Sequence, residues 1–370
     1  MNSTGADGTT AAPAGGDGGG TRGPATRGGS NVRLKDVARV AGVHPATVSR
    51  ALDPGKMWLV RPDTRAKVQS VARELGYRAD VVARSLRRGQ TTTVGVVVAD
   101  LGNTFVAPAL HGITEALERH GFMALISETQ DDHERLRASV ENLLSRRVDG
   151  MIVMAARLGD ASVIETIVRE EQPIVLAVRT LPGSPLPSVT SDDVAGGYLA
   201  ARHLAELGHT RVAELRGPDD VQSFIGRGVG FARGAAELGI NIEWVDESAI
   251  HPTPSEGQRL MEKLLAATSG VTAVFAHNDA MAIGALAALR AAGLNCPRDV
   301  SVLGYNDAPL AGHLDPPLTT VRFPGDKIGR FAAEVVIALI EEPGSVVTSM
   351  TFPPELVLRA STAPPRAGAS

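Results

Sequence analysis

Cysteine and aromatic residues are scarce in this chain of 370 residues: it has one cysteine, Cys296, and Phe, Trp and Tyr together make up 4%. A single cysteine excludes an internal disulfide and a cysteine-based metal cluster, so we expect Cys296 to be an ordinary packing residue. The chain contains no run of about 18 apolar residues, which a membrane-spanning helix would need. The N-terminus also lacks the basic start and apolar stretch of a signal peptide, so we expect a cytoplasmic protein without membrane association.

Common catalytic and cofactor-binding motifs are missing as well. The chain contains no GxSxG nucleophile elbow and no Walker loop, and its nine His show no HxxxH-type pairing. Gly226, Gly228 and Gly230 do not form a dinucleotide fingerprint, because no strand leads directly into them. We therefore expect no enzymatic activity, no metal and no cofactor.

Composition and charge divide the chain into a tail, a basic module and an acidic body. Residues 1–30 are mostly Gly, Ala, Thr and Pro, which cannot bury a core, so we predict a disordered tail. Residues 31–90 carry 13 Lys and Arg against 5 Asp and Glu, a balance of +8, whereas the whole chain has a net charge of −4. The remainder therefore stands at −12. A positive field concentrated at one end favours phosphate binding there.

Residues 33–52, RLKDVARVAGVHPATVSRAL, have the pattern of two short helices joined by a tight turn. Gly42 would end the first helix, and Pro45 stands where the second would begin, at a position that needs no N–H donor. The second helix would turn Val48 and Leu52 inward. The first helix is predicted by apolar residues at i, i+3, i+4 and i+7, namely Leu34, Val37, Ala38 and Ala41.

The outer face of the second helix carries small polar groups and one guanidinium. Two short helices with such a face form a helix-turn-helix, whose second helix enters the major groove of DNA. Arg50 is the best candidate to read a guanine, whereas Ala46 is too small for hydrogen-bonded readout. The predicted DNA-binding residues of this motif are Lys35, His44, Pro45, Ala46, Thr47, Ser49 and Arg50.

The motif LKDVARVAGVHPATVSRAL resembles the opening motif of the lactose-repressor (LacI/GalR) family of bacterial transcription factors. The resemblance implies a hinge helix within residues 79–90, with Arg84 as a further DNA-binding residue and Leu86 as an apolar wedge between base pairs of the minor groove. The alternative for this segment is a plain linker. His44 stands where the family commonly has Ser, which implies a weaker cap on the recognition helix.

A loop and a third helix are expected to complete a DNA-binding domain over residues 31–78. The loop, DPGKMWLVRPDT, is slightly longer than in well-known family members. We expect Trp58 in this loop to be packed rather than to read a base, while Lys56, Arg61 or the following Arg65 could contact phosphates. The third helix is predicted from about Asp63 to Leu75, with a buried side formed by Ala66, Val68, Val71, Ala72 and Leu75.

From Thr93 onward, nearly continuous apolar runs alternate with amphipathic segments, as in doubly wound parallel α/β sheets. About 270 residues are more than one such sheet needs, so two lobes with a cleft between them are expected. Strands are predicted in TVGVVVAD, FMALISE, GMIVMAA, PIVLAVR, RVAELRG, TAVFAHN and SVLGYND. Helices are predicted near 108–120, 134–146, 195–207, 254–268 and 280–292.

The family resemblance implies that this body is similar to periplasmic sugar-binding proteins and serves as an effector-binding and dimerisation domain over residues 91–362. The chain would cross between the lobes three times, near 188–192, 321–324 and 347–353. The implied boundaries are 92–189 plus 323–346 for the first lobe, 190–321 plus 350–362 for the second, and 363–370 for a tail.

Ligands of open α/β sheets collect beyond the carboxyl ends of strands. By the resemblance, Phe105 borders the cleft and offers a stacking face, with a plain core aromatic as the alternative. Arg179 and Arg227 would grip ligand hydroxyls or carboxylates, or form interlobe salt bridges instead. The expected effector-binding residues are Asn103, Phe105, Arg179, Arg227, Asn278 and Asn306.

Two departures from the family pattern concern the effector. Val178 and Asn306 stand where sugar-responsive members often have Asp, so two sugar-binding carboxylates are absent. The arginines that remain could favour an anionic or less hydroxylated ligand. The resemblance itself implies a sugar or related metabolite as effector, and tight binding of a neutral hexose would defeat the hypothesis of an anionic one.

The mechanism implied by the resemblance is that of a nucleoid-associated homodimeric repressor, which reads a near-palindromic operator on double-stranded DNA. A small-molecule effector between the lobes would change operator affinity. The tail TAPPRAGAS has no heptad, so we expect a dimer. A different class remains open: a sugar-binding or catalytic α/β protein carrying an unrelated N-terminal module. Salt-sensitive retention of DNA by residues 31–90 alone would discriminate between the two.

Overall fold

The computed structural model describes residues 32–53, 55–77, 90–268 and 270–366. The chain divides into two compact units, residues 1–84 and 85–370. The predicted tail of residues 1–30 and almost all of the predicted hinge segment, including Arg84 and Leu86, lie outside the described residues.

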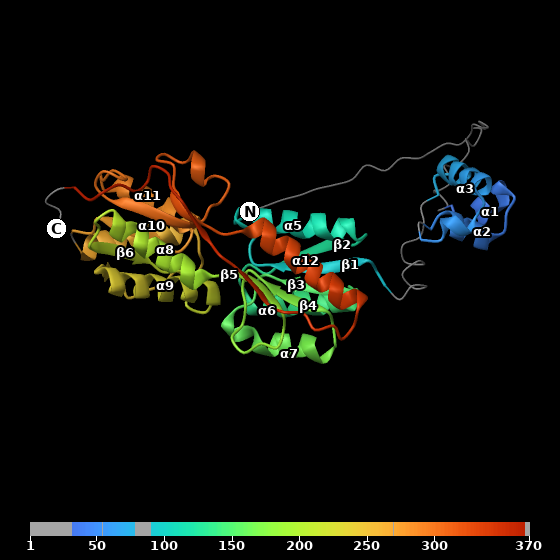
Figure 1. Cartoon of the computed structure of the whole chain (residues 1–370), viewed down its shortest axis with the longest axis horizontal. Coiled ribbons are helices and arrows are strands. Elements are labelled where there is room, and N and C mark those ends of the chain that lie inside the picture. The colour runs from blue at the N-terminus through green and yellow to red at the C-terminus, as the bar shows by residue number, and fades with distance from the viewer. Residues whose placement is uncertain (1–31, 54, 78–89, 269, 367–370) are drawn as a thin grey trace, which may run out of the picture. The chain divides into compact units, whose positions relative to one another are not determined.

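The first unit is a small helical bundle around one apolar cluster, to which Val37, Val48 and Val68 each contribute a fully buried side chain. Gly42 has φ +66° and its N–H bonds to carbonyls of the last turn of the first helix, which ends there. Pro45 begins the second helix. The predicted helix-turn-helix is thus confirmed (Figure 1), and its elements are α1 (Leu34–Ala41), α2 (Pro45–Ala51), η1 (Met57–Leu59) and α3 (Pro62–Glu74).

Two expectations about packing in this unit are wrong. Trp58 is 75% exposed instead of packed, because the loop forms the 3-10 turn η1, in which the indole N–H donates to the carbonyl of Gly55. Ala66 is exposed, because it lies two residues before Val68 and so points away from the buried face of α3.

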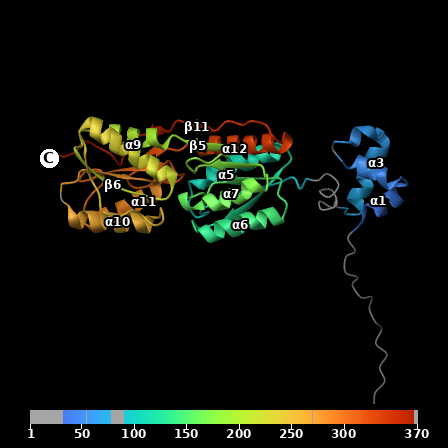
Figure 2. The ribbon, with the colours of Figure 1, turned by 90° about the horizontal axis from the view of Figure 1, so that it is seen from below.

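The first lobe of the second unit is a six-stranded parallel sheet in the order β11-β5-β4-β3-β1-β2, with helices on both faces (Figures 1 and 2). Along β1, Val94 and Val96 pack with α5 and α12, whereas Val97 packs with α6 and α7. The strands are β1 (Thr93–Val98), β2 (Met123–Glu128), β3 (Gly150–Val153), β4 (Ile174–Ala177), β5 (Ser188–Ser191) and β11 (Met350–Phe352). The helices are α5 (Val106–Arg119), α6 (His133–Ser145), η2 (Leu158–Asp160), α7 (Ala161–Arg169) and α12 (Gly325–Glu341).

The second lobe repeats this plan in the order β12-β10-β9-β8-β6-β7, except that β12 pairs antiparallel with β10. Helices α8 and α9 cover one face of the sheet, and α10 and α11 cover the other. The strands are β6 (Arg211–Leu215), β7 (Asn241–Glu243), β8 (Ala273–Ala276), β9 (Ser301–Asn306), β10 (Thr319–Arg322) and β12 (Glu355–Val357). The helices are α8 (Asp193–Glu206), α9 (Gln222–Leu238), α10 (Pro254–Ala267), α11 (Asp279–Ala291) and η3 (Ala311–His313).

The expected architecture of two doubly wound lobes is therefore confirmed. The chain passes from the first lobe to the second after β5, returns after β10, and crosses again between β11 and β12. One apolar cluster includes residues of both lobes, among them Val96 and Tyr305. None of the described helices is both long and apolar enough to cross a membrane.

Helices α8 and α9 approach each other through glycines. A Cβ atom added to Gly230 would lie 1.9 Å from the carbonyl oxygen of Val194, and one added to Gly197 would lie 2.0 Å from that of Arg227. Both distances are far below any real contact of a Cβ atom. Gly230, one of the glycines that do not form a nucleotide loop, therefore serves the packing of α9 against α8.

Candidate functional sites

The outer face of α2 is the first candidate site. Val48 and Ala51 point into the bundle, and the opposite side of the helix is open to solvent. His44 caps the helix, since its Nδ1 accepts the N–H of Ala46 at 3.2 Å. Of the predicted DNA-binding residues, the exposed ones are Lys35, His44, Pro45, Ala46 and Arg50, while Thr47 and Ser49 are half-buried. The guanidinium of Arg50 and small side chains thus share the exposed face of α2, as the readout of base edges requires.

A cleft between the lobes of the second unit is the second candidate site. It consists of two adjoining cavities of about 210 and 670 Å³, both bordered by Asp100, Asn103 and Phe105 of the first lobe. Pro252 and Thr253 of the second lobe border both cavities as well. The cleft lies beyond the ends of the strands, where ligands of such sheets collect.

Phe105 is both packed against a neighbouring ring, as a core aromatic would be, and exposed to the cleft, as a stacking surface would be. Its ring is half-buried and meets the ring of Phe323 edge to face, with 5.9 Å between the centroids. It also lines both cavities beside Asn103. An aromatic side chain held by a neighbour at its edge can still offer a surface to a ligand.

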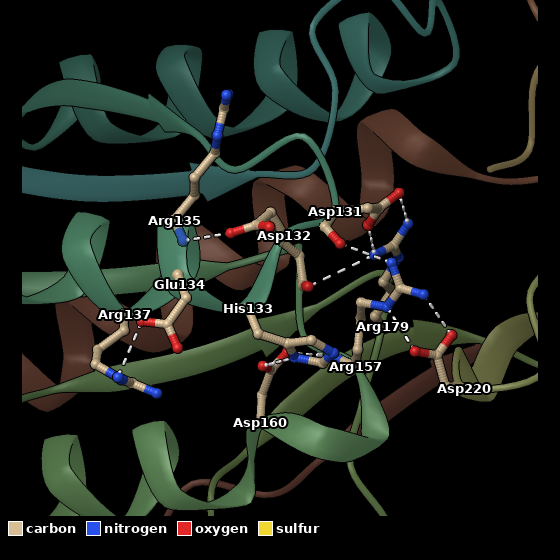
Figure 3. A network of polar contacts seen from close by, with 11 residues as sticks. Asp131, Asp132, His133, Glu134, Arg135, Arg137, Arg157, Asp160, Arg179 and Asp220 are labelled. Carbon is tan, nitrogen blue, oxygen red and sulfur yellow. Dashed lines mark hydrogen bonds and ion pairs between the residues drawn. The ribbon is translucent and has the colours of Figure 1, made fainter. Parts of the chain in front are cut away.

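Arg179 enters the larger cavity from a tight turn at the end of β4. Val178 has φ +68°, which is rare for a β-branched residue, and the N–H of Arg179 donates to the carbonyl of Ala177 at 2.7 Å. Strain of this kind concentrates at functional sites. The guanidinium of Arg179 donates to both carboxylate oxygens of Asp131, with 3.3 Å between Nη2 and Oδ2 (Figure 3).

The ion pair of Asp131 and Arg179 is buried, with each side chain 6% exposed. Burial acts to raise the pKa of Asp131, but the charges of Arg179, Arg157 and His251 outweigh it and hold this pKa below its ordinary value. Asp131 is therefore ionised at neutral pH, and the charge of Arg179 is compensated within the protein.

Arg157 and Asp220 join the two lobes at one side of the cleft (Figure 3). Nε and Nη2 of Arg157 each lie 2.7 Å from a carboxylate oxygen of Asp220, and the N–H of Leu158 donates to the carbonyl of Asp220 at 2.9 Å. Nη1 of Arg157 also donates to the carbonyl oxygen of Asp131 at 2.7 Å. We call these contacts the interlobe clasp. Through Arg157 the clasp contacts Asp131, the ion-pair partner of Arg179.

Arg227 and Asn278 do not line either cavity. Nε of Arg227 donates to Asp193 at 3.0 Å and its Nη1 to the carbonyl of His277 at 2.6 Å, which ties α9 to α8 and to the end of β8 within one lobe. Asn278 caps α11, because its Oδ1 accepts the N–H of Met281 at 2.7 Å. In this structure both residues support the second lobe.

Both arginines that could favour an anionic effector have carboxylate partners in this structure. Arg179 is paired with Asp131, and Arg227 is paired with Asp193. A guanidinium that already bonds an internal carboxylate has little attraction left for an anionic ligand.

Asn306 meets the smaller cavity at the end of β9. It is 7% exposed, has φ +114°, and its Oδ1 has no hydrogen-bond partner among the described residues. Asp279 lines the same cavity, where it accepts hydrogen bonds from Thr320 Oγ1 at 2.6 Å and the N–H of Ala308 at 2.7 Å. A buried acceptor without a partner costs free energy until a donor reaches it.

We expect the stability of the protein to fall as Asp279 ionises. Burial raises the pKa of Asp279 from 3.8 to about 7, so between these pH values the folded chain binds more protons than the unfolded chain. The free energy of unfolding should therefore decrease as pH rises through this window, by up to roughly 4 kcal/mol from this group.

Asp279→Asn should remove this part of the pH dependence. The amide can still accept the N–H of Ala308 and can donate to Thr320. Denaturant unfolding of both proteins between about pH 4 and pH 8 measures the difference. Parallel curves for the two proteins would contradict the assignment.

Known protein families match two parts of this chain. Residues 33–80 match the family described as "Bacterial regulatory proteins, lacI family", and residues 201–362 match the periplasmic binding protein-like domain. The HTH-type transcriptional repressor CytR of Escherichia coli K12 is 32% identical over 331 residues, which cover 89% of this chain and 96% of CytR. The chain belongs to the lacI family of bacterial regulatory proteins.

Other lacI-family members and structures agree with this assignment. The HTH-type transcriptional repressor PurR of Aliivibrio fischeri ES114 is 32% identical over 89% of this chain and 97% of its own length. A lac repressor dimer bound to operator and the anti-inducer ONPF superimposes with a TM-score of 0.79 at 27% identity, covering 90% of this chain and all of that one. A CelR–cellobiose complex has a TM-score of 0.66 at 30% identity, with 89% and 99% covered. These relatives are regulators, not enzymes.

Sequence reasoning missed several residues of this lacI-family cleft. Asp131 and Asp220 follow the ends of β2 and β6 within a few residues, as Arg157 follows β3. Charged residues just after a buried strand were the available signal. It could not reveal which of these charges pair across the lobes.

Proposed function

We propose that this lacI-family member is a transcriptional repressor that binds a near-palindromic operator as a homodimer. The proposal rests on one combination: an exposed face on the second helix of a helix-turn-helix, and a cleft between two lobes of the same chain, lined by both polar and apolar side chains. Two copies related by a two-fold axis would place their α2 helices on two half-sites. The absence of a membrane-spanning helix among the described residues fits action on DNA in the cytoplasm.

The DNA-binding residues in this proposal are those of the exposed α2 face and its neighbour α1. Arg50 would bond a guanine edge, and Lys35 would bond a phosphate as a point charge. His44, Thr47 and Ser49 would supply shorter polar contacts. Pro45 and Ala46 would allow close approach, and Arg84 and Leu86 would act in the hinge segment.

We propose that the effector is an uncharged, hydroxylated metabolite, of which a sugar is the simplest. Asn103 and Asn306 border the smaller cavity from opposite lobes, and Phe105 borders it as well and offers an aromatic surface. The CelR relative is a complex with cellobiose, which supports this class of ligand. Arg179 would contact the effector with the guanidinium N–H groups that do not bond Asp131. Arg227 and Asn278 would act indirectly, by holding the second lobe in shape.

The effector would act by holding the two lobes in one arrangement. A ligand that contacts both walls binds one arrangement better than another and so shifts their populations. Operator affinity then changes by the same coupling free energy.

Arg50→Ala should weaken operator binding by about 5- to 150-fold, corresponding to roughly 1–3 kcal/mol for one bidentate base contact, and should relax the preference at one base pair per half-site. Binding to a set of operators with single base changes measures both effects. Lys35→Ala is the matched control: it should weaken all operators alike and flatten the salt dependence. Equal loss on every operator with Arg50→Ala would mean that Arg50 contacts a phosphate.

The proposed function is tested by selecting operator sites from random duplex DNA with the full-length protein, with and without a mixture of neutral sugars. A near-palindromic site whose occupancy changes with the mixture is the expected result. Failure of the folded protein to enrich any sequence at low salt would overturn the proposal. Binding of sugars without any DNA binding would instead favour the alternative of a sugar-binding protein with an unrelated N-terminal module.

A further inference from the structure

The larger cavity of the cleft has a charge arrangement that no sequence pattern indicated. Arg179 lines this cavity and has its guanidinium engaged on both oxygens of Asp131, while Nη1 also lies 3.5 Å from the carbonyl of Ala155. Asp131 lines the same cavity. The position where an arginine would hold an anionic ligand is therefore filled by a carboxylate of the protein itself.

A second guanidinium lies next to this pair. Nη1 of Arg157 donates to the carbonyl oxygen of Asp131, so the residue is held between two arginines (Figure 3). Asp220 compensates Arg157 from the other lobe. His251 borders the same cavity.

The other charged groups around the cavity do not replace Asp131. Glu256 borders it but is bonded to Nε and Nη2 of Arg259 at 2.9 Å. Asp100 borders it too, and its Oδ1 accepts the N–H of Gly102 at 2.7 Å. Arg179 thus depends on Asp131 for its counter-charge.

We propose that Asp131 determines the charge class of the effector: its carboxylate occupies the anion position of Arg179 and so restricts the cleft to uncharged ligands. This inference rests on the proposed function of the cleft as an effector site. A phosphate or carboxylate entering the cavity would meet the negative Asp131 instead of a free guanidinium, and it would lose its hydration without gaining a counter-charge.

The proposal predicts a latent anion site that one substitution should expose. Asp131→Asn keeps the size of the side chain and removes its charge, which leaves the buried fork of Arg179 free for a bidentate oxyanion. The planar guanidinium matches the geometry of phosphate oxygens.

Inorganic phosphate is the probe, because it requires no knowledge of the effector. Calorimetric titration of the full-length protein with phosphate, at an ionic strength held constant with chloride, should give at least about tenfold tighter binding for Asp131→Asn than for the natural protein. The same gain should appear when glucose 6-phosphate is compared with glucose. Equal phosphate binding by the natural protein would overturn the proposal.

Asp132→Asn is the matched control. Asp132 is the exposed neighbour that caps α6 by accepting the N–H of Arg135 at 2.8 Å, a contact that asparagine also makes. It changes the net charge equally without touching Arg179. A similar gain of phosphate binding in this variant would show a general effect of charge and would also overturn the proposal.

A loss of stability in Asp131→Asn can be separated from a failure of the idea. An uncompensated buried guanidinium destabilises the fold, so phosphate should raise the melting temperature of this variant and leave that of the natural protein nearly unchanged. The double variant Asp131→Leu with Arg179→Met removes both charges and should fold without binding phosphate. Phosphate binding retained in the double variant would contradict the site. Operator selection is a separate measurement, so failure of DNA binding would count against the proposed function and not against this charge assignment.

Discussion

Gly230→Ala should lower the free energy of unfolding by about 3 kcal/mol, because the added methyl group has no space between α9 and α8. Its Cβ would lie 1.9 Å from the carbonyl oxygen and 2.8 Å from the carbonyl carbon of Val194, and 3.0 Å from the amide nitrogen of Tyr198. All three are backbone atoms, so the helices must move apart. Chemical denaturation monitored by circular dichroism measures the loss.

Gly228→Ala is the matched control in the same helix. A Cβ atom there would meet its nearest neighbour, Cε1 of His277, at 3.5 Å, which is an ordinary contact. Since alanine favours a helix over glycine by about 1 kcal/mol, this variant should be as stable as the natural protein or slightly more stable. Equal losses in both variants would show that the cost comes from something other than the approach of α8.

Asp220→Ala should weaken effector binding by about 5- to 150-fold, which corresponds to roughly 1–3 kcal/mol of coupling, because it removes the bidentate ion pair of the interlobe clasp. Arg157 is only 13% exposed, so its charge would remain largely buried without that partner. The arrangement of the lobes in which both walls meet a ligand would then be less populated. Small-angle scattering and sugar titration of the full-length protein measure the opening and the affinity.

A double-mutant cycle with Arg157→Ala isolates the clasp. If the two side chains act through each other, the double variant should lose little more affinity than either single variant. Asp219→Ala is the control: its carboxylate accepts a hydrogen bond from Ser248 within the same lobe, at 2.8 Å. Additive losses for Arg157 and Asp220, or an equal loss in the control, would count against the clasp.

Seven strands were predicted correctly from their apolar runs, which are clearest in interior strands such as β3 and β4, whose residues are all buried. Five strands were not predicted. Three of them, β7, β11 and β12, have only three residues each, and β5 (SVTS) and β10 (TTVR) contain one apolar residue each. Helix α9 was not predicted either, since Gly226, Gly228 and Gly230 lower its intrinsic preference for a helix. Of these glycines, Gly230 is the one that the close approach of α8 requires.

The candidate cleft was predictable in part for a similar reason. Asn103, Phe105, Arg179 and Asn306 follow strand ends, and parallel strands bring their carboxyl ends to one edge of the sheet. The partner of each arginine depends instead on distances between segments far apart in sequence, such as the 48 residues between Asp131 and Arg179. Charge compensation inside the cleft therefore had to be learned from the structure.

The threading of the chain through both lobes has a consequence for its synthesis. Helix α12, which covers one face of the first sheet, begins only at Gly325, and β11 adds an edge strand to that sheet at Met350. On a ribosome, most of the second lobe is therefore made before α12 can join α5 in covering Val94 and Val96. The helix-turn-helix has its own core and depends on none of these late segments. A chain truncated before residue 325 would therefore have a complete helix-turn-helix bundle followed by a first sheet with part of its apolar face exposed. Such a product would be expected to aggregate or to be bound by chaperones and degraded.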